Sequence, residues 1–272
     1  MELGCSTILY GGHPISSALD GIASAGYRAV ELCAIPGMAP HLSPDARLSE
    51  AAELRQRLAD RGLAIESIGA SGRLAVAGGS AAGSPNLSAF ERLMRLGQAL
   101  GAPAITTGSG GRSDDEPSFR AVVATMQRLA EVAAATGVVV SVKPHVNQAV
   151  YDTESARRLM GEVDPRYVGL NVDASHLLRA GEEPAAAIRA LAPQVATARI
   201  RDAVRDLDGP GTVEQQLPGG GQLDMPALAA ALASLPRPRY AVLEIVGTKE
   251  LPLDAVQRLV ETAHARLSEL FR

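Results

Sequence analysis

A lysine and a histidine directly follow a continuous apolar stretch in the middle of the chain. Residues 138–145 read Val-Val-Val-Ser-Val-Lys-Pro-His, and an apolar run that ends in polar residues is typical of a buried parallel strand. Side chains alternate along a strand, so Lys143 and His145 are predicted to share one face. Because burying an unpaired charge is costly, Lys143 must meet an anion or lose its proton. Lys143 is therefore the centre of the candidate site.

Further polar side chains end other apolar stretches of the chain. Asn171 and Asp173 are two positions apart, as are Arg199 and Arg201, so each pair is predicted to share one strand face. The residues expected to converge at one level are Lys143, Asp173, Arg199 and Glu244. Two cations and two carboxylates held together in this way supply groups for proton transfer and for stabilising a developing negative charge.

These side chains need a scaffold in which the ends of several strands meet. Apolar segments predict strands at residues 3–8, 28–33, 64–70, 104–107, 138–143, 167–173, 196–201 and 240–245. Helical spacing predicts helices at residues 15–25, 44–61, 87–100, 116–136, 153–161, 183–191, 225–235 and 253–270. Eight alternating units predict an α/β protein, a single-domain (β/α)8 TIM barrel over residues 1–272, with its chemistry at the carboxyl ends of the strands.

A doubly wound open sheet is the alternative fold. It requires a glycine-rich phosphate turn after the first strand, and residues 10–13 match that turn poorly. Two loops of the predicted barrel are also candidates for function. Residues 72–85 are long enough to form a lid, and residues 219–221 are either a phosphate-binding backbone or a plain turn.

Composition excludes several classes of protein. The formal net charge of −4 lacks the basic excess of a nucleic-acid or anionic-membrane binder. No apolar run approaches the roughly 20 residues of a membrane-spanning helix. Cys5 and Cys33 are the two cysteines among 272 residues, which favours a reducing, cytoplasmic location over a disulfide framework. We therefore expect a cytoplasmic protein that acts on a small molecule.

Five motifs along the chain occur in the order and spacing of a known family. They read Gly-Tyr-Arg-Ala-Val-Glu-Leu at 26–32, Asn-Val-Asp-Ala-Ser-His at 171–176, Arg-Ile-Arg-Asp at 199–202, Pro-Gly-Gly-Gly-Gln-Leu-Asp at 218–224 and Tyr-Ala-Val-Leu-Glu at 240–244. Together they resemble the xylose isomerase-like TIM-barrel family, also called sugar phosphate isomerases/epimerases. The resemblance covers nearly the whole chain and departs from the family pattern at the metal site.

The family's usual site holds one divalent metal with a Glu, an Asp, a His and a Glu from strands five to eight. By position, Asp173 and Glu244 match, whereas Lys143 and Arg199 replace the first Glu and the His. Neither cationic side chain has a lone pair for a metal, and both would repel one. We therefore expect no metal ligands and no cofactor, with Mn, Mg, Zn or Co less favoured, and Lys143 and Arg199 in place of the ion's charge.

The resemblance and the strand positions assign roles to nine residues. The expected catalytic residues are Glu244 as the general base, Lys143, Asp173 and His145. The expected substrate-binding residues are Arg199, Arg201, His176, Glu31 and Asn171. Alternatively, the charged residues form a purely structural ion-pair network, and the histidines only support the scaffold.

Three functions remain open at this level. The first is an isomerase or epimerase that removes a proton next to the carbonyl of a small sugar-like or keto-acid substrate. The second is a lyase of the dehydratase, decarboxylase or aldol type, in which Lys143 holds a carboxylate or forms a Schiff base. The third is a non-catalytic binding protein with a degenerate metal site.

The arginines suggest that the substrate is anionic, and the resemblance leaves a homo-oligomer open. A DNA-repair endonuclease, which the same superfamily contains, is disfavoured. Members of that type need a cluster of several metals, whereas this chain has five histidines, a negative net charge and two replaced ligands.

Overall fold

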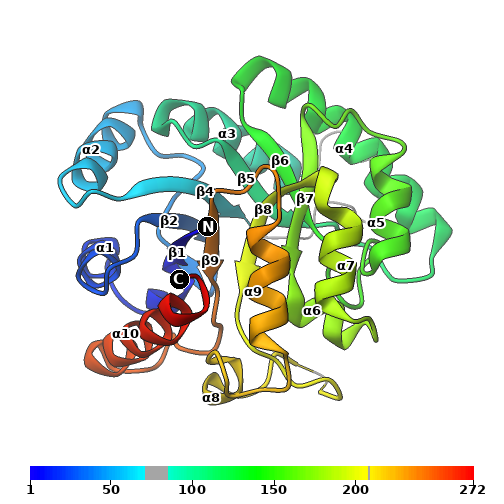
Figure 1. Cartoon of the computed structure of the whole chain (residues 1–272). Helices are drawn as coiled ribbons and strands as arrows, with labels where there is room; N and C mark the ends of the chain where they lie inside the picture. The colour runs from blue at the N-terminus through cyan, green and yellow to red at the C-terminus, as the bar shows by residue number, and fades with distance from the viewer. Residues whose placement is uncertain (71–84, 208) are drawn as a thin grey trace.

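Eight parallel strands close into a barrel in the structure, a computed structural model that describes residues 1–70, 85–207 and 209–272 (Figure 1). The strands are β1 (Glu2–Ser6), β2 (Ala29–Ile35), β4 (Ala64–Ala70), β5 (Ala104–Gly108), β6 (Val139–Lys143), β7 (Val168–Asp173), β8 (Val195–Ile200) and β9 (Tyr240–Leu243). The barrel closes at β1, where Gly4 pairs with Ala29 of β2 and with Val242 of β9. The predicted single-domain (β/α)8 barrel is confirmed.

Helices surround the barrel, and most of them agree with the predicted segments (Figure 1). They are α1 (Ile15–Ser24), α2 (Leu48–Ala59), α3 (Pro85–Leu100), α4 (Glu116–Thr136), α5 (Thr153–Met160), α7 (Pro184–Leu191), α9 (Met225–Ala233) and α10 (Leu253–Leu270). The longest of these, α4, begins where Asp115 accepts a hydrogen bond from the Ser118 backbone N–H and ends at Gly137 with φ of 73°. That left-handed conformation suits glycine.

Several short elements were not predicted. They are η1 (Thr7–Tyr10), β3 (Ala39–Pro40), α6 (Ala174–Arg179), η2 (Ala192–Gln194) and α8 (Val213–Gln216). The first predicted strand stops at Ser6 because the Ser6 side chain caps η1 by accepting from the Ile8 N–H. The connection between β8 and α9 contains α8, which Thr212 begins with a capping box. The predicted lid of residues 72–85 lies outside the described residues, apart from the first residue of α3.

Strand register brings the predicted site residues to one end of the barrel. Asp173 pairs with Arg199 of β8, and Lys143, the last residue of β6, pairs with Gly108. Below them inside the barrel, the hydroxyls of Ser141 and Thr197 bond to each other at 2.7 Å. The parallel strands are buried on both faces, which explains their nearly continuous apolar sequence.

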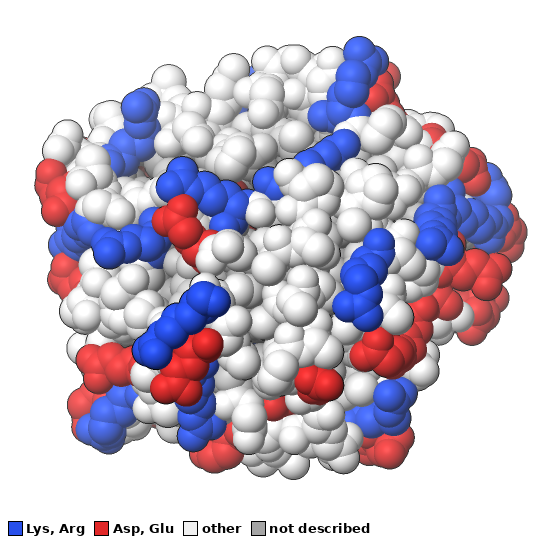
Figure 2. Space-filling view, in the orientation of Figure 1, with Lys and Arg blue, Asp and Glu red and all other residues white. Residues whose placement is uncertain are grey.

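The outer surface is mixed in charge. Figure 2 shows Lys and Arg side chains interspersed with Asp and Glu over the visible face, with broad uncharged areas between them. In the part of the chain that the structure describes, no helix has both the length and the apolar character needed to cross a bilayer. The charged residues of the predicted site lie instead inside the barrel, where they are buried.

Candidate functional site

Lys143, Asp173 and Glu244 form one ion cluster, called the lysine cluster below. Lys143 Nζ donates to Glu244 Oε1 and Oε2 at 2.7 and 2.8 Å and to Asp173 Oδ2 at 3.1 Å. These contacts use all three donors of an ammonium group. Lys143 and Asp173 end their strands, and Glu244 directly follows β9, so the cluster lies at the carboxyl end of the barrel. The predicted convergence of these three residues is confirmed.

Asp173 is held by the start of the helix that follows it. Its Oδ1 accepts from the backbone N–H of Ser175 at 3.0 Å and from the Ser175 hydroxyl at 2.7 Å, which caps α6. Burial alone would raise the pKa of Asp173, but Arg201 and Lys143 outweigh burial and hold this pKa well below its ordinary value. Asp173 is therefore a fixed carboxylate that orients the ammonium.

Arg199, Glu31 and Glu66 form a second ion cluster, called the arginine cluster. The guanidinium contacts Glu31 Oε1 at 2.5 Å and Glu66 Oε1 at 3.2 Å. Its Nε lies 3.3 Å from Glu244 Oε2, so Glu244 links the two clusters. Arg199 is fully buried. Arg199, predicted to bind substrate and to face Asp173 and Glu244, has its side chain directed mainly toward β2 and β4.

Glu31, predicted to bind substrate, is a buried hydrogen-bond acceptor inside the barrel. It receives hydrogen bonds from Ser6 at 2.6 Å and Thr106 at 2.8 Å besides its contact with Arg199. Burial would raise the pKa of Glu31, but Arg199 and these hydroxyls lower it overall. The ion pair of Glu31 and Arg199 is consequently a fixed part of the barrel interior.

Glu66 is a site-adjacent residue that the sequence prediction missed. It is 7% exposed, and burial, the largest influence, raises its pKa although Arg199 opposes that effect. The register of β2 and β4 shifts between Val30 and Glu31, so that Glu31 pairs with Ser67 and Glu66 lies at the irregularity. An acidic residue inside an otherwise apolar strand was the signal that could have indicated it.

Arg201 connects the lysine cluster to a pair of histidines. Its guanidinium donates to Asp173 Oδ2 at 3.1 Å and lies 3.3 Å from His176 Nε2. The rings of His145 and His176 stack with centroids 3.9 Å apart. Burial lowers the pKa of both histidines, most strongly for His176, so both are neutral near pH 7. Since an arginine only donates, His176 Nε2 accepts and its proton belongs on Nδ1.

Two predicted features lie apart from this constellation. Asn171 is fully buried, and its side-chain amide has no hydrogen-bond partner among the described residues, so it makes no hydrogen bond to the ion clusters. The 219–221 loop is tied to Asp202, which accepts from the backbone N–H groups of Gly219 and Leu223 at 2.9 and 3.0 Å. A Cβ at Gly221 would lie 2.4 Å from Asp202 Oδ1, so glycine is required there.

The donor set does not fit a divalent metal. Lys143 Nζ stands between the carboxylates of Asp173 and Glu244, where the resemblance expects an ion, and Arg199 stands where it expects a histidine. Within residues 1–70, 85–207 and 209–272, no three His, Cys, Asp or Glu side chains are placed to hold a metal ion. An ammonium and a guanidinium offer donors rather than lone pairs, so these residues supply positive charge without coordination.

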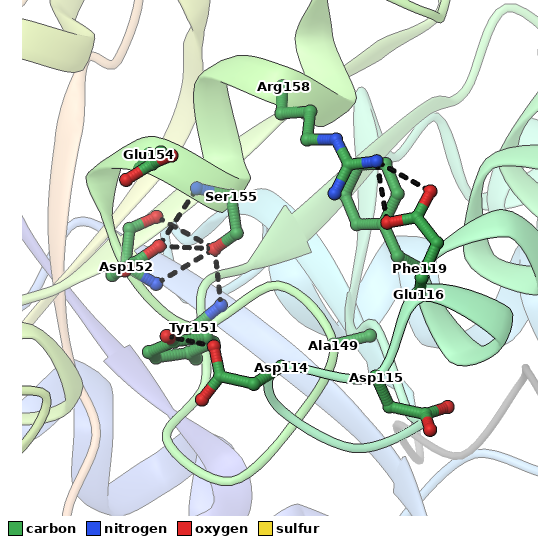
Figure 3. A pocket seen from close by; sticks show the side chains of 10 residues that line it. All are labelled: Asp114, Asp115, Glu116, Phe119, Ala149, Tyr151, Asp152, Glu154, Ser155 and Arg158. Atoms are coloured by element: carbon green, nitrogen blue, oxygen red, sulfur yellow. Dashed lines mark hydrogen bonds and ion pairs between the residues drawn. The ribbon is translucent and has the colours of Figure 1, made fainter.

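A hollow of about 320 Å³ lies outside the barrel, between the first turns of α4 and α5 (Figure 3). Its polar groups bind one another. Tyr151 donates to Asp114 at 2.8 Å, and Arg158 contacts Glu116 at 2.6 Å. Asp152 caps α5. The hollow contains none of the nine predicted site residues, so the carboxyl end of the barrel remains the candidate active site.

Comparisons with known proteins agree with this architecture. A family model described as xylose isomerase-like TIM barrel matches residues 19–265. No curated protein matches the chain in sequence.

Three solved structures illustrate the similarity. A protein with a bound zinc atom has a TM-score of 0.79 and 17% identity over 100% of this chain and 98% of its own. A probable 3-DHS dehydratase of petrobactin synthesis from Bacillus anthracis has a TM-score of 0.80 and 18% identity over 98% and 99%. The 3-keto-D-glucoside 4-epimerase from E. coli has a TM-score of 0.75 and 18% identity over 97% and 99%. At sequence identities of 17–18%, the structural similarity establishes the fold alone.

Proposed function

Because the chain belongs to the xylose isomerase-like TIM-barrel family, we propose that it is an isomerase or epimerase of a small hydroxy-carbonyl compound. The observation that carries the proposal is the lysine cluster, in which a carboxylate and an ammonium meet at the open end of the barrel. One of the similar folds belongs to a sugar epimerase, which supports this reaction type.

Glu244 is the proposed general base. Its side chain and that of Lys143 are 12% and 11% exposed, whereas Asp173 and Arg199 have no exposed side-chain surface. Glu244 takes the proton from the carbon next to the carbonyl, and the carbonyl oxygen becomes an enediolate oxygen. Lys143 stabilises that oxygen through N–H donors that it now gives to the carboxylates. Return of the proton to the former carbonyl carbon, with the hydroxyl proton moving to the former carbonyl oxygen, completes isomerisation. Return of the proton to the opposite face of the original carbon completes epimerisation.

The other residues position this pair. Asp173, itself paired with Arg201, holds Lys143 from one side, and the Arg199 guanidinium holds Glu244 from the other. His145, half-buried beside the cluster, is the proposed acid that returns the proton or binds a substrate hydroxyl. Preorganised charges of this kind cost no reorganisation at the moment of reaction.

Deuterium exchange tests the proposed function. The native protein in D2O should exchange the protons next to the carbonyl of dihydroxyacetone, followed by NMR. Glu244→Gln should slow this exchange about 10²–10⁴-fold, the usual contribution of a positioned base. Asp164→Asn removes an exposed acidic group that pairs with Arg166 and should leave the rate unchanged. Exchange that persists in the Glu244 variant would remove Glu244 as the base.

We propose that this reaction proceeds without the family's divalent metal. Elemental analysis of the purified protein should find less than one equivalent of Mn, Mg, Zn or Co. The double change Lys143→Glu and Arg199→His restores the expected ligands, so it should bind Mn²⁺ or Zn²⁺ in calorimetry where the native chain does not. A stoichiometric metal in the native protein would contradict the proposal.

A lyase is the second candidate, favoured by the fold's similarity to a probable dehydratase. A Schiff-base version would place a covalent adduct on Lys143. Borohydride reduction in the presence of hydroxypyruvate, followed by mass spectrometry, separates the two: an adduct on Lys143 supports the lyase, and its absence favours the isomerase. A binding protein without activity would show ligand binding but no Glu244-dependent exchange.

Cys5 and Cys33 are both free and buried, which supports a reducing, cytoplasmic location. Size-exclusion chromatography with light scattering measures whether the protein forms a homo-oligomer, which the family resemblance leaves open.

A further inference from the structure

The cations inside the barrel are committed to groups of the protein itself. Lys143 gives all three donors to Asp173 and Glu244. Arg201 donates to Ser175, Gln216 and Asp173 and lies beside His176. An incoming anion would therefore find no unpaired cation among these residues.

The two terminal nitrogens of Arg199 are also committed to internal groups, whereas its buried Nε has no hydrogen-bond partner among the described residues. It donates to Glu31, Glu66, Ser67 and the Ala198 carbonyl. The guanidinium has no exposed surface, so no substrate reaches it without rearrangement of β2 and β4. Both arginines that had suggested an anionic substrate thus serve internal carboxylates.

The charges of the two clusters, counted together with Arg201, also leave no positive excess. Their cations are Lys143, Arg199 and Arg201, and their carboxyl groups are Glu31, Glu66, Asp173 and Glu244. Carboxyl groups therefore outnumber cations by one. A substrate anion would enter as an excess charge in a poorly hydrated space, which is costly.

We propose that the substrate carries no carboxylate or phosphate next to its reacting carbon, and that it is a neutral ketose or aldose rather than a keto acid. This inference rests on the proposed function. A hydroxyl both donates and accepts, so it can enter between Glu244 and Lys143, giving a hydrogen bond to the first and receiving one from the second. A carboxylate only accepts, so it would separate Lys143 from Glu244 and face Glu244 as a like charge.

A matched pair of achiral ligands tests the proposal. Dihydroxyacetone and hydroxypyruvate differ by a hydroxymethyl group in place of a carboxylate, and saturation-transfer NMR with competition measures their binding to the full chain. The native protein should bind dihydroxyacetone at least about tenfold more tightly than hydroxypyruvate, given the strength of a nearby like charge. Equal or tighter binding of hydroxypyruvate would overturn the proposal.

Glu244→Gln supplies the second arm. It removes one negative charge from the lysine cluster, so hydroxypyruvate should gain at least about tenfold in affinity relative to dihydroxyacetone. Asp164→Asn, which removes an exposed carboxylate, should leave the preference unchanged. If neither ligand binds the native protein measurably, the variant decides: a selective gain for hydroxypyruvate supports the proposal, and no such gain overturns it.

The outcomes also separate this inference from the proposed function. Glu244-dependent deuterium exchange of hydroxypyruvate at native affinity would leave the proposed proton transfer standing and overturn the neutral substrate. Preferential binding of dihydroxyacetone without any Glu244-dependent exchange would support the neutral substrate and overturn the proposed proton transfer.

Discussion

The lysine cluster lies at the ends of β6, β7 and β9, whereas the arginine cluster lies within β2, β4 and β8. Both contain cations and carboxylates at hydrogen-bond distance. Glu244 and Lys143 retain some exposed side-chain surface, and Arg199 has none. The exposed side-chain surface that Lys143 and Glu244 retain, and that Asp173 and Arg199 lack, therefore separates ions that can meet a substrate from ions that can only support the scaffold.

The buried position also changes what each ion pair does for stability. A fully desolvated pair gains little over apolar packing, but the loss of one partner leaves an uncompensated charge that water cannot reach. A pair at the barrel opening can recover part of its hydration when its partner is removed. The following predictions test that difference, beginning with the largest expected effect.

Removal of Arg199 should be the most destabilising change. Arg199→Met leaves Glu31 and Glu66 buried without a cation, so the free energy of unfolding should fall by about 3–5 kcal/mol. Urea unfolding followed by circular dichroism measures it. Arg166→Met, which breaks an exposed pair with Asp164, should cost less than about 1 kcal/mol. Similar losses for the two variants would abolish the distinction between buried and exposed pairs.

Removing the charge of Glu31 or of Glu66 should destabilise the protein less than removing Arg199, and the two losses should differ from each other. The pKa of Glu31 is lowered and that of Glu66 is raised, so Glu31 is the better charge partner of Arg199. Glu31→Gln should cost about 2–3 kcal/mol, the scale of a charged hydrogen bond, and Glu66→Gln less than about 1 kcal/mol. Equal costs in urea unfolding would show that both groups carry the same charge.

Lys143→Met should cost less than Arg199→Met, although it also removes a cation from two carboxylates. Glu244 is 12% exposed and can be hydrated at the barrel opening, so we expect a loss of about 1–3 kcal/mol. Deuterium exchange of dihydroxyacetone should be lost in the same variant, because the enediolate has no donor. A stable variant that retains full exchange would exclude Lys143 from catalysis.

Stability should fall gently at mildly acidic pH through His176. Burial lowers its pKa well below the ordinary value, so the unfolded chain binds the proton more readily. The contribution is complete above about pH 6.5 and declines as pH falls toward the folded pKa, by at most about 1.4 kcal/mol per unit. Besides burial, His145, Arg201 and Lys143 lower the pKa of His176, whereas Asp173 opposes the shift.

Urea unfolding between about pH 7.5 and 5.5 measures this dependence. His176→Gln removes the titrating group, so the free energy of unfolding of this variant should depend less on pH, by at most about 1.4 kcal/mol per pH unit. Parallel curves for the two proteins would mean that His176 is not kept neutral by burial.

Much of the fold could be read from the chain because the signals were local. Apolar strands such as 64–70 and the helix 116–136 agree with the structure to the residue. Short elements escaped because single caps define them: Asp173 both ends β7 and begins α6. The sequence prediction missed Glu66 because residues 64–70 have the sequence of an ordinary barrel strand. Only the register shift against β2 showed where Glu66 lies.

The sequence by itself determined the alternation of strands and helices, the parity that puts Lys143, Asp173 and Glu244 on inner faces, and the loss of two metal-binding side-chain types. Only the tertiary structure decided which carboxylates pair with the long side chains of Lys143 and Arg199. Arg199 lies in register with Asp173, yet its guanidinium contacts Glu31 and Glu66 on distant strands. Periodicity fixes the face of a side chain, whereas barrel closure determines which charges lie within its reach.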